Sequence, residues 1–130
     1  MSVDTREPKT EIVKATAEAL VGHCRAGTTR QGLKDLYAPD AVSVEAVSMG
    51  GESRETRGVK GIEGKHDWWE TTMEVHSASA DGPYVNGDRF SVIFEFDATD
   101  RNSGKRNAMK EVALYTVDHA GKIVREEFFF

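Results

Sequence analysis

The stretches RFSVIFEFDA (89–98), NAMKEVALYTV (107–117) and KIVREEFFF (122–130) decide the fold of this chain. Apolar and polar residues alternate in each of them, which is the pattern of a β-strand with one covered face. Short segments rich in Gly, Asp and Asn separate the three stretches, and Asn86-Gly87 just before them is a strong hairpin signal. The C-terminal half is therefore predicted to be a meander of antiparallel strands.

The register of these strands is predicted by setting apolar residues opposite one another on neighbouring strands. Phe94 then pairs with Val112, whereas a slip of one residue would set Phe94 against Glu111. A left-handed Gly121 continues the pattern into the last strand, where Glu126 lies near Leu114. The predicted apolar face carries Phe90, Val92, Phe94, Phe96, Val112, Leu114, Val124, Phe128 and Phe130.

Three helices are predicted upstream, because apolar residues recur there at helical spacing. The first spans Ile12 to Cys24, the second begins at the capping residue Thr28 and ends before Pro39, and the third runs from Val59 to Met73. A short strand around Val42 and Val44, closed by a Gly50-Gly51 turn, is expected between the last two helices.

The aromatic face of the meander must be covered, and only the three helices are available to cover it. The predicted fold is therefore α+β, with three N-terminal helices packed on a strongly curved antiparallel sheet as a cone-shaped α+β barrel. At 130 residues the chain fits one domain, residues 1–130, with one core.

Composition excludes several classes of partner. The formal net charge is −5 and the basic residues are scattered, which argues against nucleic acid. No uncharged apolar run approaches the roughly 18 residues of a membrane-spanning helix. The single cysteine, Cys24, forms no internal disulfide, and the charged N-terminal segment is unlike a secretory signal, so we expect a cytoplasmic protein.

The order helix, helix, strand, helix and curved meander resembles the superfamily of nuclear transport factor two, ketosteroid isomerase and the SnoaL polyketide cyclases. The resemblance is carried by LYAPDAV (36–42), RG (57–58), KHDWW (65–69) and GKIVR (121–125), and is greatest to an uncharacterised bacterial SnoaL-like subfamily. It implies a cone-shaped pocket for a small molecule, no cofactor and a homodimer. Cyclases of this superfamily carry a carboxylate on the last strand where Phe128 stands here.

Glu126 and His76 are the candidate acid–base residues. Glu126 is predicted to face the apolar pocket together with Lys110, and a carboxylate in such surroundings has a perturbed pKa. A structural ion pair at the open rim of the sheet is the alternative for these two residues. His76 follows the third helix, and its imidazole titrates near neutral pH.

Aromatic and apolar residues are expected to line the pocket beside the acid–base groups. Trp68 and Trp69 are adjacent on a helix and point in different directions, so one lines the cavity while the other packs elsewhere. No histidine, cysteine or carboxylate spacing is typical of a metal site. The predicted ligand-binding residues are Trp68, Trp69, Tyr37, Phe90, Phe94, Lys110, Leu114 and Phe128.

Two functions are left open by the sequence. The first is binding of a small, largely apolar organic molecule, with isomerase, cyclase or hydrolase activity based on Glu126 or His76. The second is a non-catalytic dimeric interaction or scaffold module. A homodimer is expected in either case through the outer face of the sheet, where apolar residues interrupt the charged ones: Ile93, Ala113, Tyr115 and Ile123.

Overall fold

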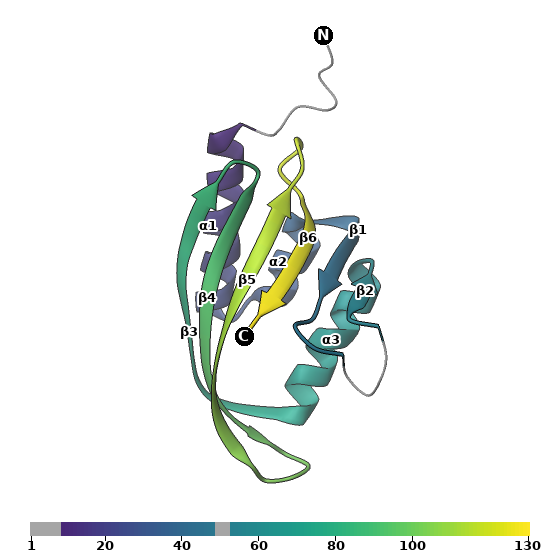
Figure 1. Cartoon of the computed structure of the whole chain (residues 1–130), viewed down its shortest axis with the longest axis vertical. Coiled ribbons are helices and arrows are strands. Elements are labelled where there is room, and N and C mark those ends of the chain that lie inside the picture. The colour runs from purple at the N-terminus through teal and green to yellow at the C-terminus, as the bar shows by residue number, and fades with distance from the viewer. Residues whose placement is uncertain (1–8, 49–52) are drawn as a thin grey trace.

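A computed structural model describes residues 9–48 and 53–130 of the chain. Three helices pack on one six-stranded sheet, and in Figure 1 the strands lie in front of α1 and α2 while α3 lies beside β1 and β2. The elements are α1 (Thr10–Ala26), α2 (Thr29–Leu36), β1 (Tyr37–Val44), β2 (Glu55–Arg57), α3 (Val59–Thr72), β3 (Met73–Asn86), β4 (Arg89–Asp100), β5 (Arg106–Val117) and β6 (Ile123–Phe129).

The α+β fold class is confirmed, with a correction to the sheet. Its strand order is β2-β1-β6-β5-β4-β3, so within the described residues it is open and does not form a closed barrel. The sheet is also mixed, because β1 runs parallel to β6 while the other neighbours are antiparallel. The parallel pair places the N-terminal strand beside the last one, a long-range contact that no local sequence pattern announces.

The predicted helices are confirmed to within two or three residues at each end. α1 ends at Gly27, which has a φ of 74°, and α2 ends at Leu36 because Pro39 disfavours helical backbone at the residue before it. The short β2 was not predicted, and the expected Gly50-Gly51 turn lies outside the described residues. None of the described helices is long and apolar enough to cross a membrane.

The predicted register of β4 and β5 is wrong by one residue. Phe94 lies opposite Glu111, and the pairs Phe90–Tyr115 and Val92–Ala113 follow the same register. The prediction rejected this pairing because it sets a carboxylate on the apolar face. The slip turns Tyr115 and Ala113 inward and Lys110 and Leu114 outward, since successive side chains in a strand point to opposite faces.

The β5–β6 register differs because of a bulge. Val117 lies opposite Ile123, as predicted, and Gly121 has the expected positive φ of 84°. Thr116, however, lies opposite Arg125, so Val124 is an extra residue on β6. Beyond the bulge Glu126 lies opposite Tyr115 and not Leu114.

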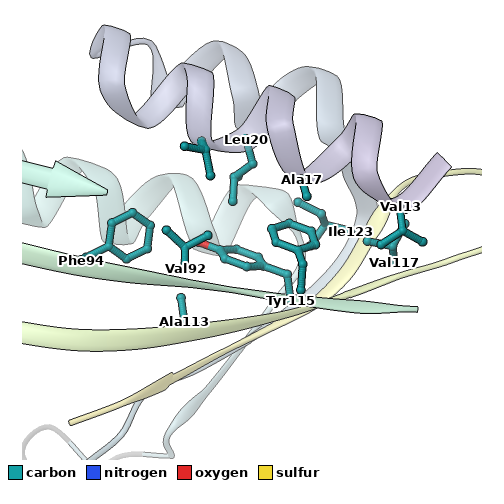
Figure 2. Packing of buried hydrophobic residues seen from close by; sticks show 11 residues of the cluster. Val13, Ala17, Leu20, Val92, Phe94, Ala113, Tyr115, Val117 and Ile123 are labelled. Carbon is teal, nitrogen blue, oxygen red and sulfur yellow. The ribbon is translucent and has the colours of Figure 1, made fainter. Parts of the chain in front are cut away.

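The core lies between α1 and the inner face of the sheet, as Figure 2 shows. Leu20 and other α1 side chains point down onto β4 and β5, where the rings of Phe90 and Tyr115 stack with their centroids 4.8 Å apart. The buried cluster consists of Val13, Ala17, Leu20, Val21, Phe90, Val92, Phe94, Ala113, Tyr115, Val117 and Ile123. This core fixes which side chains of β5 and β6 face the helices.

Candidate functional site

Glu126 is the buried charge of this inner face. Its side chain comes from β6 and the residue is 5% exposed. The Tyr37 hydroxyl donates to Oε1, and the Ser43 hydroxyl donates to Oε2 at 2.6 Å. Ser43 is level with Glu126 because β1 runs parallel to β6. A carboxylate that accepts from two hydroxyl groups is stabilised in an otherwise apolar core.

Lys65 extends this network towards the end of the sheet. Its ammonium, reaching over from α3, donates to Ser43 Oγ at 2.6 Å and forms an ion pair with Glu45. The same ammonium lies 5.2 Å from the centroid of the Phe128 ring, which is a cation–π distance. Hydrogen bonds therefore run in one direction, from Lys65 through Ser43 to Glu126.

Glu111 lies on the same inner face, nearer its open end. The pKa of this carboxyl is raised from 4.5 to about 7, mainly by burial and also by the negative charges of Glu45 and Glu126, against the opposing effect of Lys65. Within the described residues Glu111 takes part in no hydrogen bond or ion pair. It is half-buried, so its carboxyl group is both perturbed and accessible.

Aromatic rings border this half-buried end of the inner face. Trp69 of α3 meets Phe96 edge-on, with ring centroids 5.3 Å apart, and Phe94 stacks on Phe96 at 6.0 Å. Phe94 is buried, whereas Trp69, Phe96 and Phe128 are half-buried. The rings and Glu111 together make an apolar surface with one carboxyl group, next to the core cluster that α1 covers.

The negative charge of Glu126 also acts on its neighbours. Burial raises the pKa of Tyr37 and of Tyr115 well above the usual range for a phenol, and Glu126 raises both further. Burial raises the pKa of the Cys24 thiol to about 11, again with a contribution from Glu126. These three groups are therefore neutral at physiological pH, and none of them is a nucleophile there.

The predicted pair of Glu126 and Lys110 is wrong, although Glu126 does face inward. Lys110 is exposed on the outer face, opposite Glu95. Leu114 also faces outward, so its predicted place in the pocket is wrong. The cation near Glu126 is Lys65.

His76 lies far from Glu126 along the sheet. It is on the edge strand β3, where its Nε2 is 2.7 Å from Thr99 Oγ1 and 3.8 Å from Glu74 Oε1. Glu126 is level with Phe90 of β4, while His76 is next to Ala98 and Thr99. These levels are separated by about 26 Å of strand at about 3.3 Å per residue.

The predicted aromatic residues divide between core and site. Phe90 is 1% exposed and belongs to the core, whereas Trp68 is 51% exposed and points away from it. Trp69 is the tryptophan that joins the aromatic group through Phe96. Tyr37, Trp69, Phe94 and Phe128 are thus the predicted ligand-binding residues that the structure places near the polar network.

Four residues of the network were not predicted: Ser43, Glu45, Lys65 and Glu111. The alternation of Ser43 and Glu45 with Val42 and Val44 is visible in the sequence, but it predicted only a strand and assigned neither set to the core. Ser43 is in fact 0% exposed. Its burial follows from the pairing of β1 with β6, which places it over Glu126.

Two surface hollows lie elsewhere on the molecule. One, of about 540 Å³, is at the C-terminal end of β6 and includes Arg54, Arg125 and Phe130. The other, of about 460 Å³, lies along Ser77 to Ser79 and includes Lys110 and Met109. Neither is lined by Glu126 or Glu111, although the first includes Glu45 and Phe128 and the second includes Phe96 and Met109.

The raised pKa of Glu111 predicts that the stability of the protein depends on pH. The pKa of this carboxyl group is about 7 in the folded protein, above its value in the unfolded chain. Its protonation therefore stabilises the fold below pH 4.5, and this contribution is lost as pH rises through 7. Glu111→Gln is neutral at every pH. We expect this variant to be more stable than the parent by about 1–2 kcal/mol at pH 8, after allowance for solvent screening, and equally stable at pH 4. Urea unfolding at both pH values measures this, and an equal effect at the two would contradict it.

The open sheet and its three helices place the protein in the nuclear transport factor two-like, or cystatin-like, class of α+β folds. Within that class the chain belongs to the SnoaL-like domain family, whose profile matches residues 24–130. The family resemblance predicted from the sequence is thus confirmed. Among curated proteins, none matches the chain.

Solved structures agree with this assignment. A Mesorhizobium loti protein, described as a SnoaL-like polyketide cyclase and as a carbohydrate phosphatase, is 36% identical, with a TM-score of 0.83 over 91% of this chain and 98% of that one. A SnoaL-like protein from Jannaschia, also assigned as a cyclase, is 15% identical, with a TM-score of 0.71 over 95% and 88%. TerC, co-crystallised with polyporic acid, is 22% identical, with a TM-score of 0.70 over 92% and 91%. The latter two show the shared fold alone.

Proposed function

We propose that this protein binds a small, largely apolar organic molecule on the inner face of its sheet, beside the row of polar groups from Glu126 to Glu111. The observation that carries the proposal is this row itself, because a core built only for stability has no need of it. Aromatic rings beside Glu111 supply the apolar surface. The names of the cyclase-like relatives and the polyporic acid bound to TerC support a ligand of this kind.

Acid–base chemistry is the reaction class that these groups suit. A carboxyl with a pKa near neutrality accepts and returns a proton efficiently, and a nearby ammonium stabilises negative charge that develops on the ligand. An isomerisation or a cyclisation of this type needs no cofactor, since the proton that leaves one atom of the molecule returns to another. Glu126 belongs to the proposed site as part of the network, and His76 does not. The proposed location of the protein is the cytoplasm.

The inner-face location is tested by placing a tryptophan on one face of β5 at a time. Met109 is opposite Phe96 and faces inward, and the adjacent Lys110 faces outward. The probe is 2-naphthol, a small apolar aromatic with one hydroxyl group, and binding is followed by its fluorescence. Met109→Trp is expected to weaken binding at least about tenfold because the indole occupies the site, while Lys110→Trp leaves it unchanged.

The matched pair separates three outcomes. Loss of binding in Met109→Trp alone supports the inner-face site. Loss in Lys110→Trp, alone or together with Met109→Trp, would place the probe in the hollow along Ser77 to Ser79, which both residues line, and would contradict the proposal. Absence of binding to the parent protein, with 2-naphthol and with a panel of apolar carbonyl compounds, would reject the binding function.

A homodimer through the outer face of the sheet is the second part of the proposal. Of the residues predicted for it, Ala113, Tyr115 and Ile123 are in fact buried on the inner face, and only Ile93 remains outside. The register brings two others to the outer face, Val112 and Leu114. The helices pack on the opposite face, and these apolar side chains are only half-buried within the described chain, which favours a second copy as their partner.

Light scattering tests the dimer at tens of micromolar, where typical homodimers persist. The parent protein is expected to have a mass in solution of twice the 14.4 kDa of one chain. Leu114→Glu places a charge in the centre of the outer apolar residues and is expected to give a monomer with unchanged 2-naphthol binding. A monomeric parent protein would reject the dimer, and with it the scaffold alternative.

A further inference from the structure

The two inner-face carboxylates differ in what their oxygen atoms contact. Glu126 is 5% exposed, and each of its oxygens already accepts a hydroxyl hydrogen bond. Glu111 is half-buried, and within the described residues its carboxyl group has neither a hydrogen-bond donor nor an ion-pair partner. A bound molecule can reach Glu111 without breaking an existing contact, whereas Glu126 is closed to it.

We infer that Glu111 is the residue that accepts a hydrogen bond from the bound molecule, and that the site selects an apolar ligand with one weakly acidic hydroxyl group, as in a phenol or an enol. This inference rests on the proposed function and assigns its ligand-contacting residue. Glu126 is a positioning residue, which holds Ser43 and, through it, the ammonium of Lys65.

The surroundings of Glu111 support a hydroxyl donor. Phe94 lies directly opposite on β4, and Phe128 lies opposite Ala113, the next inward residue along β5. Because rings lie on both sides, Glu111 is a polar group within an apolar surface. A carboxylate without a hydrogen-bond donor is unfavourable there, and a ligand that supplies the donor removes this cost. A neutral aromatic alcohol supplies both the ring contacts and the donor.

The charges that act on Glu111 come from three elements: Glu45 at the end of β1, Lys65 of α3 and Glu126 of β6. The ammonium of Lys65 is already paired with Glu45 and hydrogen-bonded to Ser43. Lys65 therefore lowers the pKa of Glu111 by less than burial and the two carboxylates raise it. The ionised form, which accepts the hydrogen bond, forms as pH rises through about 7.

The experiment compares 2-naphthol with 2-methoxynaphthalene, which has the same rings and no hydroxyl donor, at pH 6 and pH 8. The parent protein is expected to bind 2-naphthol about tenfold more tightly at pH 8 than at pH 6, since the ionised fraction of a group with a pKa of about 7 changes by about that factor. The methoxy compound should bind about tenfold more weakly at pH 8, with no pH dependence.

Glu111→Gln, which accepts a hydrogen bond at every pH, is expected to remove the pH dependence while it keeps measurable binding. Lys110→Gln, the matched loss of a charge on the outer face, should leave the pH dependence of binding unchanged. In the ligand-free protein, carboxyl ¹³C NMR should show one glutamate that titrates near pH 7 and is missing in Glu111→Gln, independently of any ligand.

Retention of the pH dependence in Glu111→Gln would overturn the inference and leave the binding function intact. Equal affinity for the hydroxyl and methoxy compounds at pH 8 would overturn the choice of ligand class in the same way. If neither compound nor the carbonyl panel binds the parent protein, the proposed function fails and the inference fails with it. A titration near pH 7 that persists in Glu111→Gln would reject the assignment of this carboxyl.

Discussion

Phe90→Ala will lower the free energy of unfolding by about 3–5 kcal/mol, the usual cost of removing a fully buried aromatic ring. Phe90 is 1% exposed, stacks on Tyr115 and lies beneath α1 in the centre of the core. The ring cannot be replaced by neighbouring side chains, because the flanking strands fix the backbone on both sides. Urea unfolding followed by circular dichroism measures the change.

Trp68→Ala is the matched control for this prediction. It removes a larger aromatic side chain from a position that is 51% exposed, so we expect a cost below about 1 kcal/mol. The comparison tests whether Phe90 lies in the core. Similar costs for the two substitutions would mean that Phe90 does not occupy the core.

Glu126→Ala is expected to destabilise the protein by about 3–5 kcal/mol at pH 7. The substitution leaves the hydroxyl groups of Tyr37 and Ser43 without their acceptor inside the core, and separates the ammonium of Lys65 from the charge that Ser43 connects it to. Glu126→Gln retains the shape and an acceptor, and should cost about 1–2 kcal/mol. Chemical denaturation of both variants checks the order.

Lys110→Met is the control, because the sequence suggested Lys110 as the partner of Glu126. Its exposed position on the outer face predicts a change within about 0.5 kcal/mol. A cost of several kcal/mol for Lys110→Met, similar to that of Glu126→Ala, would restore the register in which these two residues face each other.

Local patterns were sufficient to predict the elements of this fold. Helical spacing, Pro39 and Gly27 set the ends of α1 and α2, and alternation predicted β4, β5 and β6 nearly to the residue. Pairing of strands is a different problem, since it depends on contacts between distant segments. The parallel contact of β1 with β6 and the open edge of the sheet could not be inferred from either strand alone.

The register failed at the residues that make the site unusual. The prediction paired apolar residues with each other, which is sound for a core but excludes a carboxyl such as Glu111 from the inner face. The bulge at Val124 added a second shift that only the ladder reveals. Sequence rules are expected to fail where function opposes stability, and the role proposed for Glu111 would make it such a position.

Part of the candidate site was nevertheless predictable. Glu126 was assigned to the inner face because it alternates with Phe128 on β6, and that face is confirmed. Its partner was not predictable, because Lys65 approaches from α3 and is connected to it through Ser43 of β1. Three elements far apart in the sequence meet there, and charge spacing along one strand contains no information about them.

Intermolecular nuclear Overhauser effects between 2-naphthol and methyl-labelled protein report which face of the sheet the molecule touches. They therefore test directly whether the binding site is on the inner face. Met109 faces inward near Phe96, whereas the methyl groups of Val112 and Leu114, on the same strand, face outward. We expect effects from the Met109 methyl group and from the ring protons of Phe128 to the naphthol, and none from Val112 or Leu114. Effects to Val112 or Leu114, without any to Met109, would contradict this expectation.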